Sequence, residues 1–410
     1  MAKKRIRVNL LLKIIIAIIL GIALAPLLPT GITRVFVTFN SLFANFLTFF
    51  IPILILTLVA PGIAELGNNA GKMLLVTVLL AYGSTVAAGL LSYFTCSWSF
   101  PMIIGENLQA ATNAVSSATE ANELTPFFTI SMPPFIDVMS ALVLAFMLGL
   151  GMAFTGSVAL RNIMEELRRI TDKVIASVMI PLLPIYIFGI FLKISADETI
   201  SAVIYSFIGI IAIIFAIHII WLLILFMLSG AISKRNPVKM LANMIPAYMT
   251  ALGTQSSAAT IPVTLAQTRK NGVSEGVASF VVPLCATIHL SGSTLKIVAC
   301  AYAVMLMNGI PSSFSLMLGF IMMLGITMVA APGVPGGAIM AALGVLSSIL
   351  GFDENLQALM IALYIAMDSF GTACNVTGDG AIAAIVERFY TKSGSAKSGS
   401  AKSGREKSVK

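Results

Sequence analysis

The stretch Asp368-Ser-Phe-Gly-Thr-Ala-Cys-Asn-Val-Thr-Gly-Asp379 places two carboxylates inside a segment that is otherwise apolar enough to lie in a lipid bilayer. On a helix, its polar residues are spaced i, i+4, i+7 and i+11 and share one face: Asp368, Thr372, Asn375 and Asp379. An ionised Asp at the bilayer centre costs about 2.5 to 3.5 kcal/mol on insertion scales, so such a residue faces a partner inside the protein. The stretch therefore predicts a buried cation or substrate site, with a polar cluster that only joins helices as the alternative.

The composition is that of an integral membrane protein. Of 410 residues, 58% are hydrophobic and 10% are charged, and the mean hydropathy is +0.99. A helix needs about 20 apolar residues to cross a hydrocarbon core of about 30 Å. Six N-terminal segments satisfy this, at residues 10–28, 36–63, 73–94, 135–155, 174–194 and 202–228.

The C-terminal half is also hydrophobic but is interrupted by clusters of Gly, Pro, Ser and Thr, at residues 253–262, 292–293, 332–337 and 371–380. Irregular backbone at membrane depth requires protein or a water-filled cavity around it. The first and third clusters are flanked by arms too short to cross, which predicts two re-entrant hairpins. Each hairpin precedes a helix with polar residues, so residues 240–308 and 312–390 read as an internal repeat.

We therefore expect three parts: six N-terminal transmembrane helices (1–239), a transport core of two hairpins and two helices (240–390), and a disordered basic tail (391–410) built on a Ser-Gly-Ser-Ala-Lys repeat.

The basic residues predict the orientation. Lys and Arg cluster at residues 3–5, 161–173, 234–239, 269–270 and beyond 388, whereas none occurs between Lys72 and Arg161. The positive-inside rule then places both termini in the cytoplasm and residues 96–127 outside. The net charge of +8 fits this topology and attraction to anionic lipid, and we expect no nucleic-acid partner.

The sequence contains no strong motif for an enzyme or for an ATP-driven pump. The four cysteines lack C-x-x-C spacing, so neither a disulfide framework nor a zinc site is indicated. Residues 67–73 lack the spacing of a phosphate loop, and no H-E-x-x-H motif occurs. Ser291 and Ser293 beside Lys296 suggest a Ser/Lys dyad only loosely. We expect no enzyme and no resident cofactor.

Four motifs in order carry a resemblance: QSSAATIPVT (255–264), PLCATIHLSGS (283–293), GVPG (333–336) and NVTGD (375–379). They resemble the dicarboxylate/amino acid:cation symporters, which include the excitatory amino acid transporters and archaeal aspartate transporters. The resemblance covers nearly the whole chain. It implies an all-α membrane protein with eight transmembrane helices, two re-entrant hairpins and inverted repeats, forming a plasma-membrane homotrimer that works as an elevator. The hairpin at 333–336 would be the extracellular gate.

The resemblance also assigns roles to residues. Asp368 would bind the substrate amino group, and Ser256, Ser257, Thr372 and Asn375 would hold its α-carboxylate, as complementary charge and hydrogen bonding require. Val334 and Gly336 would line the gate. Oxygen atoms at the following positions would bind sodium, partly as backbone carbonyls: Cys285, Thr287, His289, Asn375 and Asp379.

Departures from the family pattern narrow the function. His289 and Ser291 stand where the family usually has Asn and Asp of a third sodium site, which is therefore expected to be lost. Gly371 stands where acidic-amino-acid transporters have an Arg that clamps the side-chain carboxylate, and Gln255 occupies the second Arg position. No Arg is available for a bidentate clamp.

Lys296 and His289 leave alternatives open. His289, Ser293 and Lys296 fall at i, i+4 and i+7, on the face expected to look at the site. Lys296 either replaces the missing Arg as a partner for an acidic side chain or replaces a bound cation. His289 is either a satisfied core histidine or a titratable group that links transport to protons. His218, alone in an apolar helix, is expected to be structural.

These observations predict a symporter that imports a small neutral amino acid such as serine, alanine or threonine, coupled to Na⁺, H⁺ or both. The alternative within the class is an aspartate, glutamate or dicarboxylate symporter in which Lys296 replaces the Arg. The alternative from another class is an anion-conducting channel.

Overall fold

A computed structural model of the chain describes residues 10–67, 72–120, 124–136, 138–194, 200–329, 331 and 336–405. The described residues are helical or irregular and contain no strand. The helices are α1 Leu10–Leu24, α2 Thr30–Gly67, α3 Lys72–Glu120, α4 Val138–Thr155, α5 Val158–Val174, the π-helical turn η1 Ile175–Met179, α6 Ile180–Ile194, α7 Ile200–Ser233, α8 Pro237–Thr254, α9 Ser257–Lys270, α10 Glu275–Ile288, α11 Ser291–Met307, α12 Phe314–Val329, α13 Gly337–Leu350, α14 Glu354–Ala366 and α15 Asp368–Arg405.

Each of the six predicted N-terminal spans coincides with a helix. Among the described residues, four helices are long and apolar enough to cross a membrane, and up to six when each of two bent pairs counts as one span. The sequence pattern missed α5, which carries charged residues and begins at the N-cap Ser157, whose hydroxyl accepts a bond from the amide of Leu160 at 3.3 Å. This helix continues through η1 into α6 with a bend of 47°.

The C-terminal half contains two units of the same order, a pair of packed short helices followed by a broken helix. In the first unit, α8 and α9 form the pair, and α10 and α11 are separated at His289 and Leu290. In the second unit, α12 and α13 form the pair, and α14 and α15 are separated at Met367, with a bend of 60°. This order is the one that the predicted repeat requires.

The positions of two breaks differ from the prediction. Residues 371–380 were expected to interrupt the helix, but α15 runs through them, because their backbone hydrogen bonds are kept and the glycines pack against other elements. The interruption lies just before, at Met367. Likewise, Gly292 and Ser293 belong to the first turn of α11, and the break precedes them.

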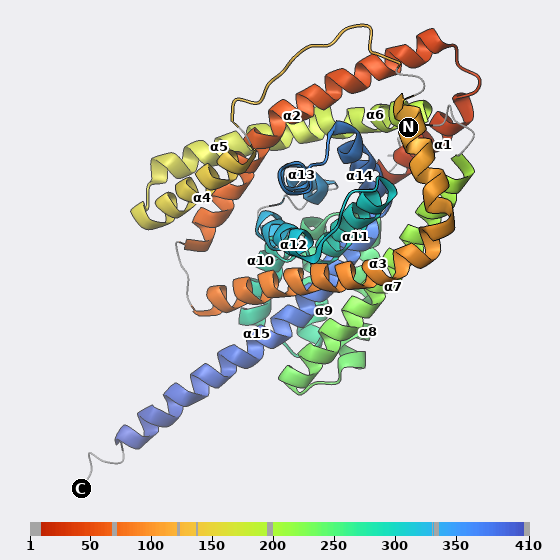
Figure 1. Ribbon diagram of the computed structural model, residues 1–410. Coiled ribbons are helices and arrows are strands. Elements are labelled where there is room, and N and C mark those ends of the chain that lie inside the picture. The colour runs from red at the N-terminus through yellow and green to blue at the C-terminus, as the bar shows by residue number, and fades with distance from the viewer. Residues whose placement is uncertain are drawn as a thin grey trace, which may run out of the picture.

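The two broken helices form the centre of the fold. Figure 1 shows α2 and α3 running around the outside of the view, with α11 to α14 between them. Helix α15 packs against α7, α8, α9, α10 and α11, and every residue of α11 except Leu306 is buried. A helix that is buried on all sides can carry polar residues only if they find partners inside the protein.

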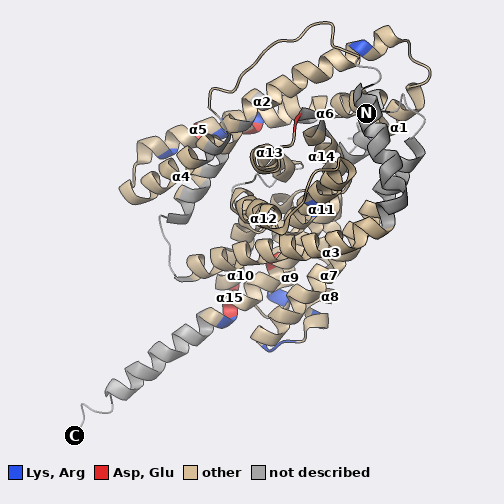
Figure 2. Ribbon diagram, viewed as in Figure 1, with Lys and Arg blue, Asp and Glu red and all other residues tan. Residues whose placement is uncertain are grey.

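Few of the residues in these helices are charged. In Figure 2 most of the ribbon is uncharged, and basic residues appear along α5 and near the ends of α8 and α9. Helix α15 is described as far as Arg405, and the expected disorder of residues 391–410 stays a prediction.

Candidate functional site

The site forms where the first turns of α11 and α15 meet. Gly292 makes this approach possible: a Cβ atom there would lie 2.6 Å from the Cβ of Cys374 and 2.7 Å from the carbonyl oxygen of Gly371. Both distances are too short for a side chain, so glycine at 292 lets the two backbones touch. The polar residues that begin the two helices are thereby brought together.

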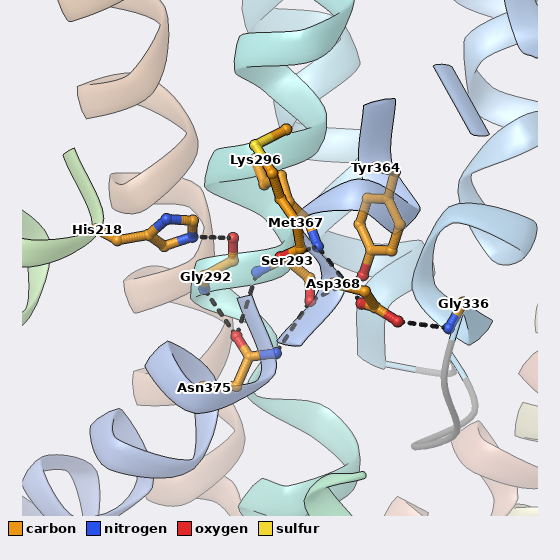
Figure 3. Close-up of polar contacts among 9 residues, drawn as sticks. All are labelled: His218, Gly292, Ser293, Lys296, Gly336, Tyr364, Met367, Asp368 and Asn375. Carbon is orange, nitrogen blue, oxygen red and sulfur yellow. Dashed lines mark hydrogen bonds and ion pairs between the residues drawn. The ribbon is translucent and has the colours of Figure 1, made fainter. Parts of the chain in front are cut away.

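Asp368 lies at the centre of this meeting point and is 3% exposed. Its Oδ1 is 3.4 Å from the Nζ of Lys296, and its Oδ2 accepts a hydrogen bond of 2.7 Å from the backbone amide of Gly336. Figure 3 shows the carboxylate between these two groups. Asp368 therefore joins α11 to the N-cap of α13, the second arm of the α12–α13 pair.

Lys296 is fully buried, and the groups around it suit a cation. Its Nζ donates to the carbonyl of Met367 at 3.3 Å and lies 3.4 Å from the centroid of the Tyr364 ring. Met367 lies between α14 and α15, and its carbonyl also accepts from the amides of Phe370 at 3.1 Å and Gly371 at 3.3 Å. A carboxylate, a helix-end carbonyl and an aromatic face thus surround one ammonium group.

Asn375 connects α15 to the start of α11. Its Oδ1 accepts from the amides of Gly292 at 2.7 Å and Ser293 at 3.2 Å, and its Nδ2 donates to the Ser293 hydroxyl at 3.0 Å. Tyr364 donates to the same hydroxyl at 3.2 Å. The side chain of Asn375 therefore caps α11 from another helix, a role that α11 needs because Leu290, its N-cap, has no capping side chain.

His218 has the structural role expected from the sequence. Its Nε2 is 3.0 Å from the carbonyl oxygen of Gly292, and because a carbonyl only accepts, Nε2 is the donor. The contact holds α7 against the first turn of α11 (Figure 3).

Asp379, the second carboxylate on the polar face of α15, has a different partner. The Nδ1 of His289 lies 2.9 Å from Oδ1 of Asp379, and its Nε2 lies 2.9 Å from the hydroxyl of Ser84 on α3. His289 and Asp379 are 0% and 1% exposed. With the proton on Nδ1, the imidazole donates to the carboxylate and accepts from the serine. On this polar face, Asp368 thus contacts Lys296, and Asp379 contacts His289.

Three other predicted residues, Ser256, Ser257 and Thr372, lie at the start of α9 and on α15. Ser256 is the N-cap of α9, Ser257 begins that helix and is buried, and α9 packs against α15. Thr372 is buried on α15 beside Gly371. Val334 lies outside the described residues.

The sodium ligand set stays a prediction. The carbonyl of Cys285 accepts from the amide of His289 at 2.8 Å, and the hydroxyl of Thr287, an exposed residue, donates to the carbonyl of Leu284 at 2.7 Å. Within the described ranges, no group of three or more His, Cys, Asp and Glu residues could hold a metal ion.

Sequence reasoning missed three contributors to the site: Ser84, Tyr364 and Met367. Met367 contributes only its carbonyl, which no residue type reveals. Ser84 and Tyr364 lie in apolar helices away from the four motifs. The only sign of their role was that a polar side chain within an apolar helix needs a hydrogen-bond partner inside the protein.

The chain is similar to known proteins along most of its length. Residues 10–389 match the model of the sodium:dicarboxylate symporter family. The serine/threonine transporter SstT of Acinetobacter baumannii is 29% identical over 399 residues, which cover 93% of this chain and 97% of that protein. The corresponding protein of Acinetobacter baylyi is 26% identical over 396 residues, 93% and 98% of the two chains.

A more distant relative is an excitatory amino acid transporter of Caenorhabditis elegans, 27% identical over 264 residues, which cover 62% of this chain and 51% of that protein. The family model spans both halves of the fold, including the residues of both carboxylate pairs. The chain belongs to the sodium:dicarboxylate symporter family.

Proposed function

We propose that the protein is a symporter that imports a small neutral amino acid of the serine or threonine kind. The observation that carries this proposal is the pairing of Lys296 with Asp368 at the position left open by Gly371. In this arrangement Lys296 is the counter-ion of Asp368 and is not held as the partner of a second substrate carboxylate. The full-length similarity to proteins named serine/threonine transporters supports the same substrate class.

The site offers complementary groups for both ends of an amino acid. Asp368 is the carboxylate for the α-ammonium, and charge-assisted bonds of this kind are about twice as strong as neutral ones. Thr372, Asn375 and the N-terminus of α9 at Ser256 and Ser257 are the donors for the α-carboxylate. A hydroxyl on the substrate side chain would face Gly371 and the ammonium group of Lys296, which lies 2.9 Å from the Cβ position of Gly371.

The coupling ions are proposed to be Na⁺, H⁺ or both. Asp379 and the carbonyls near Cys285, His289 and Asn375 supply hard oxygen ligands for Na⁺. The histidine contact of Asp379 supports a contribution of protons. These ions are cargo of the transport cycle.

The proposed architecture has eight transmembrane spans: α1, α2, α3, α4, α5 with η1 and α6, α7, α10 with α11, and α14 with α15. The pairs α8–α9 and α12–α13 would be re-entrant hairpins, because each pair packs two short helices against each other directly before a broken helix. A homotrimer with an elevator motion, as is typical of the family, completes this proposal.

The proposed location is the plasma membrane, with both termini in the cytoplasm. The orientation can be tested with single cysteines, because all four native cysteines are buried and should resist thiol reagents. In intact cells an impermeant maleimide should label Thr125→Cys and spare Lys270→Cys. The reverse pattern would overturn the orientation.

Uptake into proteoliposomes tests the function. We expect labelled serine and threonine to accumulate under an imposed sodium or proton gradient, with saturation and slow turnover, and Asp368→Asn to serve as the inactive control. Accumulation of aspartate or glutamate in preference to serine would favour the alternative in which Lys296 replaces an Arg. A non-saturating anion current without accumulation would favour a channel.

A further inference from the structure

The surroundings of Lys296 are those of a bound cation. Its ammonium contacts the Asp368 carboxylate at 3.4 Å, the carbonyl that ends α14 at 3.3 Å and the Tyr364 ring at 3.4 Å. Broken helices in transporters place helix-end carbonyls near membrane depth, where they coordinate cations. Here a side chain of the protein itself occupies such a position (Figure 3).

The same carboxylate also holds the α12–α13 pair. One oxygen of Asp368 faces Lys296, and the other accepts from the amide of Gly336 at 2.7 Å. Both partners of the carboxylate come from the protein itself. It also ties the first residue before α13 to the core of the fold.

We propose that Lys296 is a tethered counter-ion that takes the place of the substrate's α-ammonium on Asp368 in the substrate-free carrier. This inference rests on the proposed function. When an amino acid binds, its ammonium displaces Lys296 from Asp368, and Lys296 keeps the Met367 carbonyl and the Tyr364 face. When the amino acid leaves, Lys296 returns to Asp368.

The proposal has a consequence for the transport cycle. A carrier that completes net uptake must return empty across the membrane, and an uncompensated buried carboxylate opposes that step. Lys296 would neutralise Asp368 during the return, so no free cation has to accompany the empty carrier. Exchange of internal for external amino acid bypasses this step, because the carrier is loaded in both directions.

The test compares net uptake with exchange in proteoliposomes. The variants are Lys296→Met, which keeps the bulk and removes the charge, and Lys296→Ala, which leaves room for a small amine. The exposed Lys270→Ala on α9 is the control for loss of one lysine. Serine affinity is measured on the same purified proteins by the shift in thermal unfolding.

We expect Lys296→Met to lose net uptake at least tenfold more than it loses serine exchange, and to bind serine more tightly than the parent protein. Methylammonium inside the vesicles should restore net uptake by Lys296→Ala, because it supplies the missing cation. Lys270→Ala should behave as the parent protein does. If Lys296→Met proves unstable, Lys296→Ala purified in methylammonium carries the same comparison.

Three results would overturn the inference: net uptake that survives in both variants, exchange that falls as much as net uptake, or weaker serine binding by Lys296→Met. The last two would assign Lys296 to substrate binding instead. Failure of the proposed function has a different signature, since the parent protein itself would then neither exchange nor accumulate serine.

Discussion

A Cβ atom on Gly371 would lie 2.9 Å from the Nζ of Lys296 and 3.3 Å from its Cε, so residues 371 and 296 share one volume. Any side chain at 371 must displace the lysine. An Arg at 371, the residue that acidic-amino-acid transporters of this family are expected to carry, is therefore incompatible with Lys296 in its observed position. The cationic group of this site is the side chain of Lys296 on α11, and residue 371 on α15 contributes none.

Because Arg at 371 and Lys296 cannot occupy the same space, we can predict how substrate specificity changes in variants. Gly371→Arg alone should abolish serine exchange, because two cations would compete for Asp368. Gly371→Arg combined with Lys296→Ala should recover exchange and shift it towards aspartate, since the planar guanidinium can bind a carboxylate with two hydrogen bonds. Competition of unlabelled serine and aspartate against labelled substrate measures the shift. A double variant that still prefers serine would contradict the shared volume as the basis of specificity.

Removal of the Asp368 charge should weaken amino acid binding. A hydrogen bond to a charged group contributes about 1.5 to 3 kcal/mol, so Asp368→Asn should reduce serine affinity by roughly 10- to 100-fold. Binding of labelled serine to the purified protein measures the loss.

The matched control for Asp368 is Asp353→Asn. Asp353 is exposed and caps α14 by accepting from the amide of Leu356 at 2.9 Å. Asparagine caps as well as aspartate, so this variant should bind serine like the parent protein. Equal losses in the two variants would show that the effect of Asp368→Asn is not specific to the site.

The polar stripe of α15 could be predicted because the period of an α-helix places Asp368 and Asp379 on one face. Their partners could be predicted only in part. His289 and Lys296 were placed on one continuous helical face, but the chain breaks between α10 and α11 just after His289. The two basic residues therefore reach different carboxylates, and no local pattern in the sequence encodes that separation.

Contacts made by backbone groups were beyond prediction. The amide of Gly336 and the carbonyl of Met367 belong to helix ends whose positions depend on tertiary packing. Short Gly-rich segments also mislead: residues 371–380 suggested a break, yet Gly378 and Gly380 sit in a continuous helix at close approaches to His289 and Met244. The glycines there allow close contact between helices. The sequence alone does not distinguish a glycine that breaks a helix from one that allows such a contact.

The contact between His289 and Asp379 should be a strongly coupled one. Both side chains are buried, and removal of one partner of a buried pair destabilises a protein by about 3 to 5 kcal/mol because the other is left uncompensated. His289→Ala and Asp379→Ala should therefore be non-additive, with a coupling energy of about 1 to 3 kcal/mol in a double-mutant cycle. Unfolding by denaturant in mixed micelles measures each free energy.

The exposed pair Arg269 and Glu275 provides the control cycle. Their contact is of similar length, 3.1 Å, but the side chains are 49% and 72% exposed. Exposed ion pairs contribute about 0 to 1 kcal/mol, so the coupling should be small and should vanish in high salt. Coupling energies of equal size in the two cycles would argue against a strong buried contact between His289 and Asp379.

The close approach at Gly292 should be essential to the site. Its Cβ position lies 2.6 Å from the Cβ of Cys374, and both atoms belong to buried backbone segments that cannot swing away. Overpacking of this kind costs about 1 to 3 kcal/mol. Gly292→Ala should therefore lower the thermal unfolding temperature and weaken serine binding, because separation of α11 from α15 breaks the bonds from Asn375 to the amides of Gly292 and Ser293.

The control for Gly292 is Gly319→Ala on α12. Gly319 is exposed, and its Cβ position has no atom within 4 Å among its described neighbours. Alanine is favoured over glycine in a helix by about 0.5 to 1 kcal/mol, so this variant should unfold at the same or a slightly higher temperature and bind serine normally. Normal serine binding by Gly292→Ala would mean that α11 and α15 can separate without loss of the site, and the capping of α11 by Asn375 would then have no part in substrate recognition.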